Sequence, residues 1–135
     1  MDIPNPIIRQ LEYRDELYEL YPYLYKAVLS NGKVLRIKDK YIFDGASIPR
    51  VLWSLIGSPF EFSYSICHDI LYQAELMTRA EADWEFILIL KLKGVGWVKR
   101  NAMWLGLRAG GWVTWNKHTP ESIAEARAFG TLESR

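Results

Sequence analysis

The sequence predicts a single α+β domain, in which a small antiparallel β-sheet packs on a bundle of three to four helices. Two β-type runs flank the dipeptide Asn31-Gly32, which is a strong hairpin signal. Helical periodicity dominates from residue 61 onwards. Half of the 135 residues are hydrophobic, which is enough for one core, and the length suits one domain.

The chain divides into parts of different composition. Residues 1–8 carry Pro4 and Pro6, which fix φ and remove amide donors, so we expect an extended arm. Residues 9–19 are mixed in character and are expected to form a short strand or a turn. The predicted organisation is the arm (1–8), a β-rich part (9–43), a motif loop (44–50), a helical part (51–115) and a polar tail (116–135) with a short helix at 120–128.

The hairpin around Asn31-Gly32 is expected to carry a two-residue type I′ turn, because both residues tolerate positive φ. Such a turn would place Leu29 opposite Val34 and Ala27 opposite Arg36. A third β-type run at 41–43 would complete the small sheet.

The motif loop reads Asp-Gly-Ala-Ser-Ile-Pro-Arg from Asp44 to Arg50. Ser47 suits a helix cap and Pro49 the first turn of a helix, so one interpretation is a plain connection from strand to helix. The other is a binding loop, because function concentrates on such loops. In that case Asp44, Ser47 and Arg50 are the candidate binding residues.

A short helix at 51–56 is expected to precede a helical hairpin over residues 61–94. The first helix of the hairpin is predicted over 61–77 from its apolar repeat. Thr78 and Glu81 form a capping box that starts the second helix, and Gly94 ends it.

The last long helix is predicted over 97–110. Three small residues spaced by four lie along one side of it and allow another backbone to approach, so we expect that side to pack on the hairpin: Ala102, Gly106 and Gly110. We also expect Trp104 and Trp112 to be core residues, because a small domain needs large buried side chains.

Composition excludes several classes of protein. Lys and Arg total 17 against 16 Asp and Glu, a net charge of +1, so a nucleic-acid partner is not expected. Cys67 is the single cysteine, which excludes an internal disulfide and a Cys-based zinc cluster. The first residues do not resemble a signal peptide, and no apolar run reaches the ~20 residues of a membrane span.

His68 and Asp83 are the most informative polar residues of the hairpin. Asp83 shares a helical side with Phe86 and Leu90, so its carboxylate points toward the expected interior, where it needs a partner. Antiparallel packing places Asp83 level with Tyr72 and within about one turn of His68. A carboxylate behind an imidazole fixes its tautomer and raises its basicity, as in a general base.

Three interpretations of this group stay open. In a catalytic one, His68 deprotonates a water and Asp83 orients His68, while Tyr72 belongs to the same site. Asp69 and Asp44 would then hold a divalent cation such as Ca²⁺ or Zn²⁺, or position a substrate. In a structural one, the group is a satisfied polar network that locks the helices together. In the third, a solvated polar stripe consists of Tyr64, Ser65, His68, Tyr72 and Glu75.

The pattern His-Asp-x-x-Tyr followed by an Asp on an antiparallel helix resembles the catalytic helix pair of secreted phospholipases A2. His68, Asp69, Tyr72 and Asp83 match that motif one for one. The flanking cysteines of that family are absent except for Cys67, its glycine-rich calcium loop is not recognisable, and the separation of His and Asp is shorter here. The likeness covers about 20 residues and is an analogy.

A second resemblance spans roughly residues 33 to 115. The motifs Phe43 to Arg50, His-Asp-x-x-Tyr from His68, and Arg-x-x-x-Asp-x-x-Phe from Arg79, followed by a final helix with Gly and Trp, resemble a family of small tailed-phage and prophage proteins known as a domain of unknown function (family 1353). The resemblance implies a bacteriophage or prophage gene and a protein in the bacterial host cytoplasm or in the virion, associated with the tail. It implies no activity.

Three functions are therefore expected as alternatives. The leading one is a virion or tail structural or assembly component that docks on other phage proteins through an aromatic patch. Trp97, Trp104, Trp112 and Trp115 alternate with basic residues, which also suits peripheral contact with a membrane. The second is a small hydrolase that acts on host lipid or peptidoglycan with a His-Asp centre. The third is an inhibitor of a host enzyme or defence system.

Overall fold

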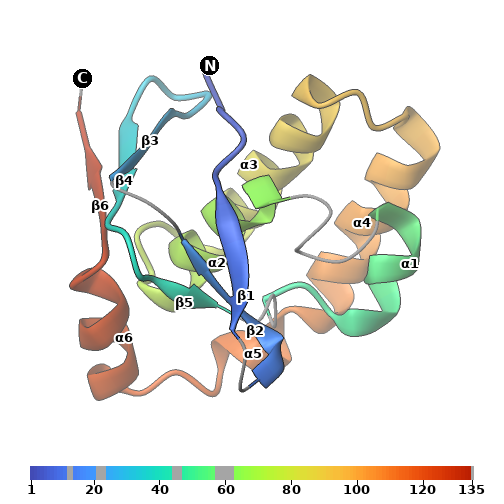
Figure 1. The fold of residues 1–135 in the computed structure, drawn as a ribbon. Helices are drawn as coiled ribbons and strands as arrows, with labels where there is room; N and C mark the ends of the chain where they lie inside the picture. The colour runs from blue at the N-terminus through green and yellow to red at the C-terminus, as the bar shows by residue number, and fades with distance from the viewer. Residues whose placement is uncertain (12–13, 21–23, 44–46, 57–62, 135) are drawn as a thin grey trace.

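The computed structural model describes residues 1–11, 14–20, 24–43, 47–56 and 63–134, and within them it shows the predicted α+β fold (Figure 1). Two antiparallel three-stranded sheets, with strand orders β1-β2-β5 and β3-β4-β6, lie beside the helices. In chain order the elements are β1 (Ile8–Leu11), β2 (Arg14–Leu20), β3 (Tyr25–Val28), β4 (Val34–Ile37), β5 (Ile42–Phe43), η1 (Arg50–Leu52), α1 (Trp53–Ile56), η2 (Ser63–Ser65), α2 (Ile66–Gln73), α3 (Arg79–Leu92), α4 (Trp97–Gly110), α5 (Trp112–Trp115), α6 (Pro120–Arg127) and β6 (Gly130–Glu133).

The β3-β4 hairpin forms where it was predicted, but the predicted register is wrong by one residue. Val28 lies opposite Val34 and Ala27 opposite Leu35. A type I′ turn needs positive φ at two residues, and here Gly32 alone of the turn residues has it, with φ 81. The amide of Leu29 therefore bonds to the carbonyl of Lys33 at 2.9 Å, and three residues form the loop.

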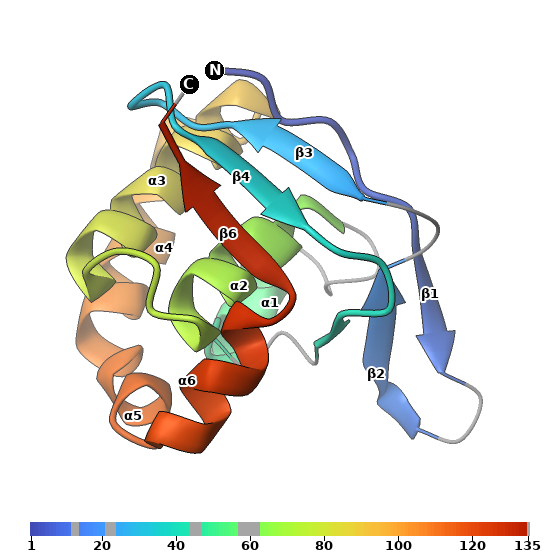
Figure 2. The same cartoon turned by 90° about the vertical axis from the view of Figure 1, so that its left-hand side faces the viewer.

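Strand β6 was not predicted; it pairs antiparallel with β4 and makes β4 the central strand of its sheet. Figure 2 shows this sheet lying over α2, with α6 leading into β6 from below. Helix α6 was predicted, and its N-terminus is capped by Thr119, whose side chain accepts a hydrogen bond from the amide of Ser122.

The predicted helical hairpin is present as α2 and α3. Thr78 and Glu81 form the capping box of α3, and Gly94 has φ 89 beyond its end. The first helix is shorter than the predicted 61–77, because α2 ends at Gln73 and Glu75 takes a positive φ of 44. Arg127 closes this turn by donating to the carbonyls of Ala74 at 2.8 Å and Glu75 at 3.3 Å.

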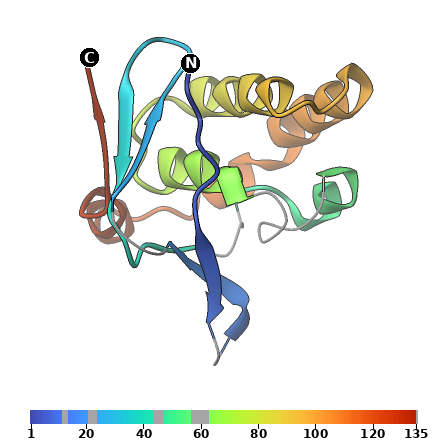
Figure 3. The same cartoon turned by 45° about the horizontal axis from the view of Figure 1, so that its top comes forward.

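Helix α2 is the middle of the protein (Figure 3). Its residues from Ile66 to Tyr72 are all buried. On one side they join the hydrophobic cluster of the sheet residues, and on the other Ile48, α3 and α4 build a second cluster. Polar residues of α2 are therefore enclosed between two cores.

The small side of α4 does not pack on the hairpin as predicted, but on Pro49 near the end of the motif loop and on Leu52 just after it. A side chain added at Gly106 would contact Leu52 at 2.6 Å, and one at Gly110 would lie 3.3 Å from Pro49. The hairpin is instead contacted by Met103 and Leu107, which are buried against α3. The core prediction for Trp112 is wrong, because this side chain is 52% exposed, whereas Trp104 is partly buried against the second cluster.

The N-terminal arm is fixed at three points, one of which is the hydrogen bond that the Tyr25 hydroxyl donates to the carbonyl of Pro4 at 2.6 Å. Asp2 forms an isolated β-bridge with Val28, and the Lys93 ammonium donates to the carbonyl of Ile3 at 2.5 Å. In the described ranges, every helix is too short or too polar to cross a lipid bilayer.

Candidate functional site

A cluster of polar side chains lies where the motif loop, α2, α3 and α4 meet. Each of these elements contributes at least one member, so the group forms only when the whole helical half is assembled. We call it the polar cluster, and its members are Ser47, His68, Arg79, Asp83 and Arg108.

A chain of hydrogen bonds joins Ser47, His68 and Asp83. The Ser47 Oγ lies 3.0 Å from Nδ1 of His68, and Nε2 of the same ring lies 2.9 Å from Oδ1 of Asp83. All three residues are fully buried. The imidazole thus has a hydroxyl on one nitrogen and a carboxylate on the other, which is the arrangement of an oriented base.

Two arginines hold the second oxygen of Asp83. Nη1 of Arg108 donates to Oδ2 at 3.0 Å, and Nη1 of Arg79 lies 3.6 Å from the same oxygen. Burial by itself would raise the pKa of Asp83, but the hydrogen bonds from His68 and Arg108 outweigh it and hold the pKa below its usual value. Asp83 is therefore a carboxylate at neutral pH.

His68 is neutral in this environment. Burial lowers its pKa below the usual value, against the opposing effect of the Asp83 carboxylate. Because a carboxylate only accepts hydrogen bonds, the ring proton resides on Nε2 and is donated to Asp83. Nδ1 then carries the lone pair, and the Ser47 hydroxyl donates to it.

Aromatic rings enclose the imidazole. The ring centroids of Tyr72 and Phe86 lie 4.5 and 4.9 Å from that of His68. The Tyr72 hydroxyl lies beside Asp83 and Arg79, and burial raises its pKa, so it stays a neutral phenol. Gly111 leaves the space for this hydroxyl, because an added Cβ would collide with it.

Asp69 points away from the polar cluster. Its Oδ2 accepts a hydrogen bond from the Tyr41 hydroxyl at 3.1 Å, and it lines a pocket of about 360 Å³ beside Phe43 and Phe129. Asp44, its predicted partner in a cation site, lies outside the described residues. Over the ranges that the structure covers, no three His, Cys, Asp or Glu side chains converge as metal ligands.

The structure brings together four of the predicted site residues: Ser47, His68, Tyr72 and Asp83. The interpretation of a solvated stripe is wrong, because Ser65, His68 and Tyr72 are buried. Arg50 lies apart, exposed on η1 with its guanidinium 4.8 Å above the Trp53 ring. Arg108 was not among the predicted site residues, although a buried carboxylate at Asp83 signals the need for a cation.

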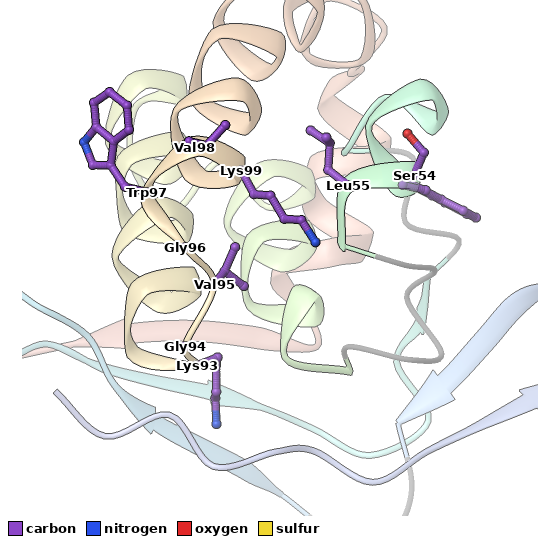
Figure 4. A pocket seen from close by; sticks show the side chains of 10 residues that line it. Ser54, Leu55, Lys93, Gly94, Val95, Gly96, Trp97, Val98 and Lys99 are labelled. Atoms are coloured by element: carbon purple, nitrogen blue, oxygen red, sulfur yellow. The ribbon is translucent and has the colours of Figure 1, made fainter.

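A separate groove of about 750 Å³ opens between α1 and the turn from α3 to α4 (Figure 4). Trp53, Leu55 and Val95 form part of its lining, and Lys93 and Lys99 add positive charge. No member of the polar cluster lines this groove.

Comparison with known proteins identifies a family. The family model described as "Protein of unknown function (DUF1353)" matches residues 18–107, a range that contains Ser47, His68 and Asp83 and ends one residue before Arg108. The chain is 37% identical over 65 residues to "Uncharacterized protein y4jT" of Sinorhizobium fredii (strain NBRC 101917 / NGR234). The alignment covers 45% of this chain and 19% of that relative, so the chain spans far less than two thirds of its length. No solved structure is significantly similar to the chain.

Proposed function

Because the chain belongs to the DUF1353 family, whose function is unknown, we propose its function from the polar cluster: a small hydrolase of ester or amide bonds in which His68 is the general base. Asp83 orients His68, and Arg108 keeps Asp83 ionised. We further propose that the gene is of bacteriophage or prophage origin and that the substrate is a component of the host envelope, lipid or peptidoglycan.

The observation that carries the proposal is the hydrogen-bonded chain from Ser47 through His68 to Asp83, at 3.0 and 2.9 Å. A satisfied structural network needs partners for its polar atoms, but it does not need a neutral imidazole whose free lone pair faces a hydroxyl. This combination allows proton transfer from the hydroxyl to the ring, while the carboxylate stabilises the imidazolium that forms.

The likeness of α2 and α3 to the catalytic helix pair of phospholipases A2 supports a lipid or other ester as the substrate. In that likeness His68, Tyr72 and Asp83 occupy the matching positions, and here they lie in contact. Ser47, His68 and Asp83 are fully buried, so a substrate reaches them only after the residues that cover them move.

Hydrolysis by matched variants tests the proposal. The purified protein is incubated with p-nitrophenyl esters, phospholipid vesicles and peptidoglycan sacculi, and released products are quantified. We expect turnover of one of these substrates, lost by about 100-fold or more in His68→Gln and Asp83→Asn. His118→Gln is the control, because His118 bonds to Glu75 at 3.2 Å outside the polar cluster. Circular dichroism shows whether each variant is folded, and folded His68→Gln with full turnover would refute the proposal.

A second candidate is the virion or tail assembly component, and exposed apolar side chains on one face of α4 and α5 favour it. Val98, Leu105 and Trp112 are spaced by seven, which places them in one stripe, and they are 73%, 67% and 52% exposed. Leu105→Ser combined with Trp112→Ser would then prevent incorporation into phage particles, while His68→Gln would not. Loss of binding to lipid vesicles instead would indicate contact with a membrane.

A further inference from the structure

The hydroxyl held at Nδ1 of His68 belongs to the chain itself, not to a water. We infer that Ser47 is the nucleophile and that hydrolysis passes through an acyl ester on its Oγ. This inference rests on the proposed hydrolase function and makes carboxylic esters and amides the substrate class. It assigns a chemical role to Ser47, which was predicted from the sequence as a helix cap or a binding residue.

The direction of the hydrogen bond between Ser47 and His68 follows from the charges around it. Asp83 already faces two guanidinium groups, those of Arg79 at 3.6 Å and Arg108 at 3.0 Å. A protonated His68 would add a third positive charge around one carboxylate, in a fully buried place. The neutral ring donates from Nε2 and must accept at Nδ1, so the proton of Ser47 is aimed at the base.

The position of Ser47 is set by the segment that follows it. Ile48 is buried in the second hydrophobic cluster, and Trp53 donates its indole proton to the carbonyl of Ile48 at 3.2 Å. Pro49 packs close to Gly110, and Leu52 covers Gly106. These contacts fix the serine against His68 from one side, as a preorganised nucleophile requires.

The reaction balances with the groups present and water. The Ser47 Oγ forms a bond to the carbonyl carbon while its proton passes to Nδ1 of His68. The bond from that carbon to the alcohol or amine then breaks, and the leaving group takes the proton from Nδ1. Water next adds to the acyl carbon and gives its proton to Nδ1, after which Oγ leaves the carbon and regains a proton.

Covalent labelling tests the inference directly. Diisopropyl fluorophosphate reacts with an activated serine, whose Oγ bonds to phosphorus as fluoride leaves. We expect a single adduct in the intact mass, mapped by peptide mass spectrometry to Ser47. Because Ser47 is buried, labelling follows local opening and is measured over hours. A wild-type protein that stays unlabelled, or an adduct on another residue, would overturn the inference.

A second buried serine provides the matched control. Ser65 is also buried, but among the described residues its Oγ has no hydrogen-bond partner, so no imidazole is hydrogen-bonded to it. We expect Ser65→Ala to be labelled like the wild type, Ser47→Ala to remain unlabelled, and His68→Gln to be labelled at least ~100-fold more slowly. Equal labelling of His68→Gln would overturn the inference.

Substrate turnover by the same variants separates this inference from the function on which it rests. Loss of turnover in both Ser47→Ala and His68→Gln supports both. Full turnover in Ser47→Ala with loss in His68→Gln means that water is the nucleophile, which overturns the role of Ser47 and leaves the hydrolase. Full turnover in folded His68→Gln would refute the proposed hydrolase function itself, together with the role of Ser47.

Discussion

Arg108 donates to Oδ2 of Asp83 at 3.0 Å and leaves Oδ1 to His68. The two residues come from different helices, α4 and α3, so this ion pair fixes both the spacing of the helices and the charge of the carboxylate. Arg108 therefore affects both the stability of the fold and the ionisation of Asp83.

Removal of the Arg108 guanidinium is expected to lower the free energy of unfolding. A hydrogen bond to a charged group contributes about 1.5–3 kcal/mol, and we expect Arg108→Ala to lose about that amount while Arg79 keeps part of the pairing. Urea unfolding measures the difference. Lys99→Ala, at an exposed position of the same helix, should change the value by less than about 0.5 kcal/mol. A similarly small change in Arg108→Ala would contradict the role given to the ion pair.

Stability is expected to fall as the solution becomes acidic. The pKa of His68 is lowered in the folded protein, so the unfolded chain binds an extra proton once the pH drops below the ordinary value of 6.5. The free energy of unfolding should therefore decline below pH 6.5, by up to about 1.4 kcal/mol per pH unit, until the folded-state pKa is reached. Asp83 contributes with the same sign at lower pH, since its pKa is also lowered.

Urea unfolding between pH 7.5 and 5 checks this dependence. His68→Gln should flatten the slope in that range, because the group that takes up the proton is gone. An unchanged slope in His68→Gln would show that other groups cause it.

Substitution of Gly111 is expected to destabilise the fold because a larger side chain has no room there, not because the backbone needs a conformation that favours glycine. A Cβ there would collide with the Tyr72 hydroxyl and lie 3.1 Å from Nη1 of Arg79. Gly111→Ala should cost about 1–3 kcal/mol, as overpacking of a core does. Gly96→Ser is the control, because the space around Gly96 is open and serine is favoured at an N-cap. Equal thermal stability of the two variants would contradict the close fit at Tyr72.

Glu85 is expected to hold the β3-β4 loop against α3. Its carboxylate accepts from the amide of Ser30 at 2.7 Å and from the Ser30 hydroxyl at 2.6 Å. Glu85→Ala should lower the free energy of unfolding by about 1.5–3 kcal/mol. Ser30→Ala removes one of the two bonds and should cost less, and the double variant should be less destabilised than the sum of the two. Additive effects would show that the contact is not energetically coupled.

Local signals were sufficient to predict the limits of α3. Thr78 with Glu81 and Gly94 mark the limits of α3 through bonds to their own neighbours, so the sequence alone predicts them. The hairpin register failed because Asn31 and Gly32 were both expected at positive φ, and a loop held by Glu85 needs it only at Gly32. The register of the hairpin thus depends on a tertiary contact, the one between Glu85 and Ser30, which the local sequence does not reveal.

The same distinction applies to the site. His68 and Asp83 were predicted to meet because a short turn joins α2 to α3, so their separation follows from helix geometry. Arg108 and Ser47 reach the imidazole and its carboxylate from parts of the chain whose approach depends on how α4 packs. The small side of α4 was predicted to face the hairpin, which was wrong. With that packing, neither the contact of Arg108 with Asp83 nor that of Ser47 with His68 could be predicted.

The β3-β4-β6 sheet can be completed only late in synthesis, because β6 follows β4 by more than 90 residues in the chain. The ribosome releases β4 long before residues 130–133, so the nascent sheet has an open edge until its last strand arrives. Gly130 then docks against Ile70 of α2, where an added Cβ would lie 2.5 Å from the Ile70 side chain. Chains arrested before Gly130 should therefore be cleaved rapidly by proteases and prone to self-association, whereas release of four more residues closes the edge.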